Sequence, residues 1–373
     1  MSPHSWSPSS RRRHGRRNRA SALATTALVS ALALAACGSS SPHAQVPAAG
    51  AVPSSAADAA AKTPGSIPPG TSIPPGTTLR VGDQLEFLQT ILHTAGEDQN
   101  LPFKLQWAGF IGGPPMLQAF HANAIDAGFV ADTPLIFAQA AKQDVVAIAA
   151  WATQHGTSEL IAAPNSGING WADLKDKNVA FQKGTSAEAT ILQGLQGVGL
   201  ALDDIKAVDL PITQILAALQ GGSVQAGVLV APLDTAYLKS NPGAKIVDRP
   251  GNLTARVSFL IASKSAIDDP AKAAALADYI ARFGQALAKI KADPDAFVKN
   301  FYVAKYGLTP AAGEALLAQN GSSSIISLSG DLIPAQQALA DLYQSAGEIP
   351  DKVDASKEFD TRFADAIKRA TSG

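Results

Sequence analysis

From residue 79 onward, short apolar segments alternate with amphipathic segments of helical length, and this alternation constrains the fold more than any other feature. The period-3.6 spacing of Leu85, Leu88, Ile91 and Leu92 predicts a helix over residues 84–95, which Gly96 ends. Four more apolar runs and two more helical segments follow before residue 164. We expect strands at 79–82, 104–107, 125–130, 145–150 and 160–163, and the further helices at 116–123 and 132–140.

The same alternation restarts after residue 170 and gives way to a mostly helical region from Pro270. Alternating strands and helices are typical of an α/β fold with mainly parallel sheets, and two successive sets predict two lobes. We expect strands at 178–182, 207–210, 225–230, 245–247 and 257–262, and helices at 171–174, 186–198, 212–220, 270–291, 294–305, 310–319, 334–346 and 355–371.

The N-terminus has the pattern of an export signal. Six arginines within the first 19 residues precede an apolar stretch over 20–33, and Leu34-Ala35-Ala36 leads to Cys37. A cysteine after such small residues resembles a bacterial lipobox, in which the Cys37 thiol receives a diacylglycerol anchor. An ordinary signal peptide with an incidental cysteine is the alternative, and export by the twin-arginine route through Arg16-Arg17 stays open.

Residues 38–78 are dominated by Ser, Pro, Ala and Gly, and contain the repeated hexamer Ser-Ile-Pro-Pro-Gly-Thr at 66–71 and 72–77. Such a segment buries too little apolar surface to order itself, and its Pro-Pro pairs favour extended geometry. We therefore predict a disordered, semi-stiff tether between the anchor and the folded body.

The formal net charge of −1 combines a basic signal with an acidic body, because residues 37–373 carry 24 Lys and Arg against 31 Asp and Glu. A body with a net charge of −7 argues against a nucleic-acid-binding surface. The single cysteine excludes an intramolecular disulfide and a cysteine-rich zinc site. No apolar run after residue 36 approaches the roughly 20 residues of a membrane-spanning helix.

No sequence motif in the chain indicates a catalytic site. His93, His121 and His155 show no metal-binding spacing, and the chain has no Gly-x-Ser-x-Gly elbow and no Walker-type loop. We therefore expect no catalytic residue, no resident metal and no cofactor. Carboxylates from distant positions could still meet, so an enzyme stays an alternative.

Four loops with small or hydroxyl residues stand between a predicted strand and a predicted helix: 82–84, 113–115, 132–134 and 184–186. A helix N-terminus offers free backbone N–H groups and a partial positive charge, and ligands of parallel sheets bind at the carboxyl ends of the strands. Several such loops around one cleft would hold an anion without an arginine. Each loop alone is equally explained as an ordinary helix cap.

Two blocks resemble the substrate-binding proteins of ABC importers in the aliphatic sulfonate, taurine and nitrate group, which have a periplasmic-binding-protein type 2 fold. The first block comprises residues 112–119, 125–128 and 132–141, and the second comprises 171–180 and 182–187. The resemblance covers about 79–262. It implies two α/β lobes, two crossings near 162–165 and 250–257, a ligand between the lobes, and delivery to a membrane permease.

Together with the signal pattern, this resemblance implies a lipid-anchored protein on the extracytoplasmic face that acts as a monomer. The expected division is a signal peptide over 1–36, a tether over 37–78, a first lobe from 79–163 and 256–373 with C-terminal helices, and a second lobe over 164–255.

The resemblance also implies which residues bind the ligand. The first lobe would contribute Gln84, Gly113, Pro114, Asp132 and Thr133, and the second lobe would contribute Gly184, Thr185 and Ser186. Arg256 would supply a counter-charge, and the alternative is a solvated residue or a salt bridge at the crossing.

The chain departs from these relatives after residue 230, where Ala231-Pro232-Leu233-Asp234 replaces a Trp-Asp-Pro-Tyr-like stretch. An aromatic wall of the ligand site is therefore missing. The sequence leaves the identity of the ligand open, and the candidates are alkanesulfonates, taurine, nitrate and larger aromatic sulfur compounds. An enzyme on the same fold and a sensor module with a separate receptor are the other functional hypotheses.

Overall fold

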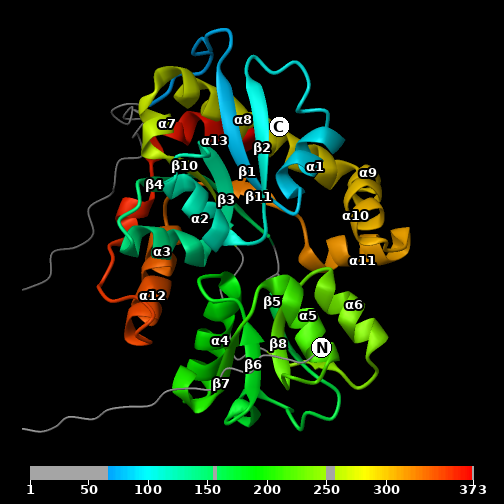
Figure 1. The fold of residues 1–373 in the computed structure, drawn as a ribbon. Helices are drawn as coiled ribbons and strands as arrows, with labels where there is room; N and C mark the ends of the chain where they lie inside the picture. The colour runs from blue at the N-terminus through cyan, green and yellow to red at the C-terminus, as the bar shows by residue number, and fades with distance from the viewer. Residues whose placement is uncertain (1–65, 154–157, 249–256, 372–373) are drawn as a thin grey trace, which may run out of the picture. The chain divides into compact units, whose positions relative to one another are not determined.

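The computed structural model describes residues 66–153, 158–248 and 257–371 (Figure 1). The predictions for the signal peptide, for Cys37 and its lipid, for His155 and for Arg256 lie outside these ranges.

The first lobe is built on a six-stranded sheet with the order β11-β4-β10-β3-β1-β2. β1 pairs in parallel with β2 and β3, whereas β10 and β11 run antiparallel to their neighbours. The strands are β1 (Thr78–Gln84), β2 (Lys104–Phe110), β3 (Ala127–Ala131), β4 (Val145–Ala152), β10 (Val257–Ser263) and β11 (Ser324–Ile326).

The second lobe is built on a five-stranded sheet with the order β7-β6-β8-β5-β9, drawn in green in the lower part of Figure 1. β6 is parallel to β7 and β8, and β5 is antiparallel to β8 and β9. Its elements are β5 (Ser158–Ala162), β6 (Asn178–Phe181), β7 (Lys206–Asp209), β8 (Ala226–Val230), β9 (Lys245–Ile246), η1 (Trp171–Leu174), α4 (Ser186–Gly197), η2 (Leu202–Asp204), α5 (Ile212–Gln220) and α6 (Leu233–Ser240).

Helices surround the first sheet, and most of them come from the C-terminal third of the chain (Figure 1). The early helices are α1 (Phe87–Thr94), α2 (Gly113–His121) and α3 (Asp132–Ala140). The late elements are α7 (Lys264–Asp268), α8 (Pro270–Ala292), α9 (Asp295–Phe297), the π-helical η3 (Val298–Val303), α10 (Ala304–Tyr306), α11 (Pro310–Asn320), α12 (Leu332–Ser345), η4 (Ala355–Glu358), η5 (Thr361–Phe363) and α13 (Ala364–Thr371).

The predicted two-lobe α/β fold with a helical C-terminal segment is confirmed, and the sheets are mixed instead of mainly parallel. The first crossing differs from the expectation: residues 160–163 were assigned to the first lobe, but β5 pairs with β8 and β9. The chain therefore leaves the first sheet before residue 158. A short apolar run can form a strand in either sheet, and the sequence does not show which strand it pairs with.

Three local expectations are also corrected. Residues 66–77, predicted as tether, contribute the half-buried Ile67 and Ile73 to the core, and the Ile67 N–H donates to the Arg362 carbonyl. The helix expected from Gln84 begins at Phe87, because β1 continues to Gln84. The expected helix over 355–371 is divided into η4, η5 and α13, since the side chain of Asp360 caps a new turn at Arg362.

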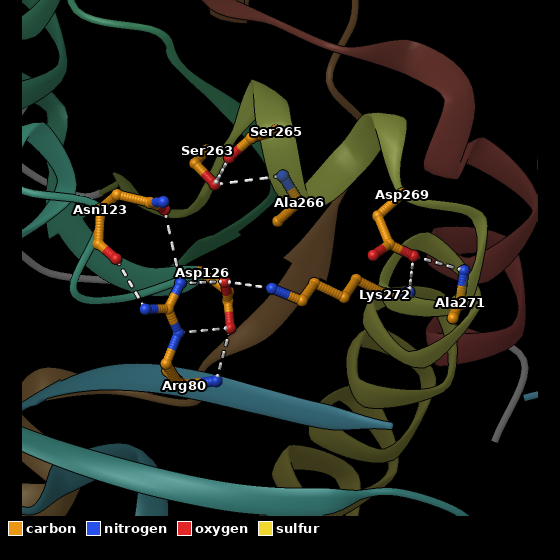
Figure 2. Close-up of polar contacts among 9 residues, drawn as sticks. All are labelled: Arg80, Asn123, Asp126, Ser263, Ser265, Ala266, Asp269, Ala271 and Lys272. Atoms are coloured by element: carbon orange, nitrogen blue, oxygen red, sulfur yellow. Dashed lines mark hydrogen bonds and ion pairs between the residues drawn. The ribbon is translucent and has the colours of Figure 1, made fainter. Parts of the chain in front are cut away.

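A buried ion cluster joins β1, the segment before β3 and α8 (Figure 2). Asp126 is 1% exposed, and its carboxylate lies 2.6 Å from the Arg80 guanidinium and 2.8 Å from Lys272 Nζ. Burial alone would raise the pKa of Asp126, but the hydrogen bonds from Arg80 and Lys272 hold it below its usual value. The pairing therefore ties a C-terminal helix to the first strand of the chain.

Within the described ranges, no helix combines the length and the apolar character that crossing a membrane requires.

The packing of α13 on α8 depends on Gly284. A Cβ at this position would lie 2.3 Å from Ala370 Cβ and 2.7 Å from the Ala370 backbone. We predict that Gly284→Ala lowers the free energy of unfolding by about 1–3 kcal/mol, because overpacking outweighs the helix propensity of alanine. Urea unfolding measures this, with the exposed Gln285→Ala as the control on the same helix. Equal stability of both variants would contradict the packing argument.

Candidate functional site

The helix starts singled out in the sequence lie at the carboxyl ends of strands in both sheets. β3 ends at Ala131 and α3 begins at the next residue. In the second lobe, β6 ends at Phe181 and α4 begins at Ser186, with Thr185 as its N-cap. This is the edge at which α/β sheets bind ligands.

The start of α3 is buried and organised by Asp132. The Asp132 carboxylate accepts a hydrogen bond from the Thr133 N–H at 2.7 Å and lies 3.2 Å from the Thr133 hydroxyl. Burial raises the pKa of Asp132 to about 6, although the hydrogen bonds from Thr133 oppose the shift. Asp132 therefore holds Thr133 in place and carries only part of a negative charge near pH 6.

The start of α4 uses some of its donors internally. The Thr185 hydroxyl accepts from the Ala187 N–H at 3.2 Å and donates to the Gln182 carbonyl at 2.7 Å. The Gly184 N–H donates to the Glu188 carboxylate at 2.8 Å. Among residues 66–153, 158–248 and 257–371, the backbone N–H of Ser186 meets no hydrogen-bond acceptor.

Glu188 is fully buried beside this loop. Burial, helped by the negative charges of Glu348 and Asp209, raises its pKa to about 7, against the hydrogen bond from Gly184 and the positive charge of Lys183. Below pH 7 the loop therefore loses a neighbouring negative charge.

The three helix starts lie close to one another, and glycine is required for the contact between α2 and α3. A Cβ on Gly113 would lie 2.5 Å from Pro134 Cγ, so the starts of α2 and α3 pack as closely as backbone permits. A Cβ on Gly184 would lie 3.4 Å from Pro114 Cγ, which places the α4 loop of the second lobe against α2 of the first. Pro114 and Pro115 have no N–H, so Gly113 supplies the only donor of the first three residues of α2.

Tyr343 of α12 lies between the two lobes, and the sequence analysis missed it. Its buried hydroxyl is 3.2 Å from the Thr133 hydroxyl and 3.3 Å from the Thr185 carbonyl oxygen. One hydroxyl proton can serve only one of these acceptors at a time. A single tyrosine in an amphipathic helix carries no sequence signal for such a role, because its partners are distant in the chain.

The same helix packs against both lobes. One core cluster contains Ile136 of α3, Leu192 of α4 and Leu339 of α12, and Lys183 pairs with Glu348 at 3.0 Å. α12 therefore connects α3 and α4 through apolar contacts, and the segment that follows α12 adds one ion pair to the α4 loop.

Seven of the nine predicted site residues are thus brought together, and we refer to them as the helix-start group: Gly113, Pro114, Asp132, Thr133, Gly184, Thr185 and Ser186. Gln84 is not in this group: its side-chain amide donates to the Phe129 carbonyl at 2.7 Å, and it lines the cavity described next. Arg256 is outside the described residues.

A cavity of about 640 Å³ opens at the same strand ends, and the sequence analysis did not predict it. We call it the aromatic cavity. Val230 at the end of β8 and Ala231 directly after it line the cavity, so both lobes contribute to its wall. Its principal ring side chains are Phe87, Phe129, Trp151, Phe297, Phe301, Tyr302 and Tyr306. Four of these rings lie within residues 297–306, and this cluster of aromatic residues is the sequence feature that could have indicated the cavity.

Behind the helix-start group, Glu358 is buried with 1% exposure. It accepts a hydrogen bond from Gln336 Nε2 at 2.9 Å, and the same nitrogen donates to the Asp132 carbonyl oxygen. Burial raises the pKa of Glu358 to about 8, and the charge of Asp132 adds to the shift.

Within the described ranges, no group of three or more His, Cys, Asp or Glu side chains is placed to hold a metal ion.

Residues 114–278 match the family described as NMT1/THI5 like. A putative aliphatic sulfonates-binding protein of Escherichia coli (strain K12) is 29% identical over 278 residues, which are 74% of this chain and 86% of that protein. One of the same description from Bacillus subtilis (strain 168) is 27% identical over 271 residues, 72% of this chain and 78% of that protein.

Among solved structures, the alkanesulfonate-binding protein SsuA from Xanthomonas axonopodis pv. citri, bound to MOPS, matches with a TM-score of 0.70 and 28% identity, covering 77% of this chain and 99% of that one. The periplasmic aliphatic sulphonate binding protein SsuA from Escherichia coli matches with a TM-score of 0.66 and 28% identity, covering 76% and 91%. The desulfurization enzyme DszB, at 14% identity and a TM-score of 0.56, shares the fold alone.

Fold and site together define a two-lobe α/β protein of the periplasmic-binding-protein class. Residues 114–278 carry the NMT1/THI5-like family match, and the chain is homologous to the SsuA aliphatic-sulfonate-binding proteins. The resemblance predicted from the sequence is confirmed.

We predict that Glu358→Gln makes the protein less sensitive to alkaline pH. Because the folded-state pKa is raised from 4.5 to about 8, the folded state binds more protons than the unfolded state in this window, and stability falls as pH rises through it. The variant should melt on the order of 5 °C above the parent at pH 8, with the difference shrinking toward pH 4.5. Scanning calorimetry at pH 5 and 8 measures this.

Asp351→Asn is the control, because it makes the same carboxylate-to-amide change at an exposed position. An equal rise in melting temperature at pH 8 in both variants would show that the burial of Glu358 does not set the pH dependence.

Proposed function

We propose that this chain is an extracytoplasmic solute-binding protein that captures a small anionic organosulfur compound of the sulfonate type and delivers it to the permease of an ABC importer. The observation that supports this most is the convergence of three helix starts from two lobes in the helix-start group. The relatives named as sulfonate-binding proteins support the same ligand class.

The electrostatics of the body favour a local binding mechanism. Residues 37–373 carry a net charge of −7, so the overall field does not attract anions. Backbone N–H groups and the positive ends of α2, α3 and α4 act over one helical turn, where a sulfonate can accept several hydrogen bonds at once. The ligand would bind by hydrogen bonds to the backbone N–H groups of Gly113, Thr185 and Ser186. The Thr133 hydroxyl would donate to it after turning away from the Asp132 carboxylate.

We also propose that the protein binds its ligand without converting it. The helix-start group contributes hydroxyls, backbone N–H groups and Asp132, whose carboxylate is engaged by Thr133. The chain's only cysteine is Cys37, in the lipobox-like segment. These groups provide binding donors and no paired nucleophile and base.

The proposed organisation follows from the sequence pattern and the two sheets. Residues 1–36 would be a signal peptide, and Cys37 would carry the lipid that anchors a monomer to the outer face of the membrane. The segment up to residue 65 would be the tether. The lobes would divide at the chain crossings before β5 and before β10.

Cys37→Ser tests the anchor. Loss of the thiol removes the only site for the diacylglycerol, so the variant should lose fatty-acid labelling and leave the membrane fraction in a bacterial host. Fractionation after labelling measures both. Retention of the label in the variant would contradict a lipid at Cys37.

Ser186→Pro tests the helix-start group. Ser186 is the first residue of α4, where proline is tolerated, and Thr185 has the extended backbone that proline requires before it (φ −129°, ψ 169°). The substitution removes one N–H donor. We expect ethanesulfonate to bind about 10- to 100-fold more weakly by titration calorimetry, the value of one hydrogen bond to a charged group.

Ser186→Ala is the matched control, because it removes the hydroxyl and keeps the N–H. It should bind more tightly than Ser186→Pro. An unchanged dissociation constant in Ser186→Pro would show that the start of α4 does not bind the anion.

A further inference from the structure

The aromatic cavity lies at the edge of the sheets where the helix-start group lies. It is lined by the last residues of three strands, Gln84, Ala131 and Val230, and by Ser258 near the start of the antiparallel β10. Because β10 runs antiparallel to β3, the first residues of β10 lie at the edge of the sheet where β1 and β3 end. The cavity therefore belongs to the ligand-binding edge of the fold and not to a remote surface.

Two chain connections place the cavity beside the helix-start group. Ala131, which lines the cavity, directly precedes Asp132 and Thr133. On the second lobe, Val230 pairs with Ser158, whose hydroxyl lies 3.4 Å from the Ser186 hydroxyl. An anion held at the helix starts would have its substituent next to the cavity.

Aromatic rings form a continuous wall. Phe87 lies 5.8 Å from Phe129 and 5.6 Å from Phe301, measured between ring centroids. Phe129 lies 5.6 Å from Trp151, and Phe297 stacks on Phe301 at 5.2 Å with an interplanar angle of 13°. Ring edges and faces at these distances suit another aromatic group, which gains beyond the area that it buries.

The cavity is too large to be filled by a ligand with a short alkyl tail. A volume of about 640 Å³ is in the range of pockets for ring-containing ligands of drug size, about 300–1,000 Å³. Ala231 has only a methyl side chain on the wall contributed by the second lobe, so it leaves this space open. A two-carbon sulfonate would leave most of the apolar wall without contacts.

We propose that the aromatic cavity binds the aryl tail of the ligand, and that the substrate class is therefore aryl- or arylalkyl-sulfonates instead of short alkanesulfonates. This rests on the proposed function, since the helix-start group would hold the sulfonate. Phe129, Phe297 and Phe301 would contact the ring, and the space beside Ala231 would admit the linker. The helix-start group would bind the polar end of the ligand, and the aromatic cavity would bind its apolar end.

The test compares 3-phenylpropane-1-sulfonate with propane-1-sulfonate by titration calorimetry on the full chain. Both probes carry the same charge and linker and differ only in the ring. We expect the phenyl compound to bind about 30- to 100-fold more tightly, because one ring transfers roughly 100 Å² of apolar surface from water. Equal affinities would overturn the proposed substrate class.

Ala318→Trp fills the cavity from α11, where Ala318 is exposed and lines it. We expect this variant to weaken the phenyl compound at least tenfold and to leave propane-1-sulfonate unchanged. Ala311→Trp is the control, since it lies two turns away on the same helix face, is exposed, and does not line the cavity. An equal effect of both tryptophans, or of Ala318→Trp on both probes, would overturn the tail assignment.

Ser186→Pro and 3-phenylpropan-1-ol separate this inference from the proposed function. The proline variant should weaken both sulfonates by the same factor, and the uncharged alcohol should bind far more weakly than its sulfonate. Tight binding of the alcohol that Ala318→Trp abolishes would support the tail site and contradict the anion site. Binding of neither sulfonate would contradict the proposed function itself.

Discussion

The insertion of β10 between β3 and β4 is the constraint on which the rest of the structure depends. All seven of its residues pair antiparallel with β4 and five of them with β3, and β3 and β4 share no pairing of their own. The first sheet is therefore completed by a strand that follows the second lobe in the sequence. The return of the chain through this strand also brings α8 to the first sheet, where Lys272 reaches the buried Asp126.

The same constraint assembles the site. Because β10 runs against its neighbours, its first residues stand at the edge where β1 and β3 end, and the chain that follows supplies the aromatic elements from α9 to α10. The helix-start group and the aromatic cavity are thus adjacent through topology. Polar donors come from the early part of each lobe, and apolar surface comes largely from the C-terminal segment.

Burial of carboxylates around the helix starts gives the site a charge that varies with pH. Asp132, Glu188 and Glu358 all have pKa values raised by desolvation, to about 6, 7 and 8. Each hydrogen bond from a neighbouring residue opposes the shift without cancelling it. The surroundings of the positive helix ends are therefore less negative than the formal charge of the sequence suggests.

The sequence by itself determined the alternation of strands and helices, the two lobes and the helix starts, because these depend on local spacing, turn residues and capping groups. Contacts between distant residues were decided only by the tertiary structure. Tyr343 meets Thr133 and Thr185 across the lobes, Gln84 turns toward Phe129, and β5 joins the second sheet. The aromatic cavity belongs to the same category, since its rings come from four separate segments and form one wall only after the chain has returned through β10.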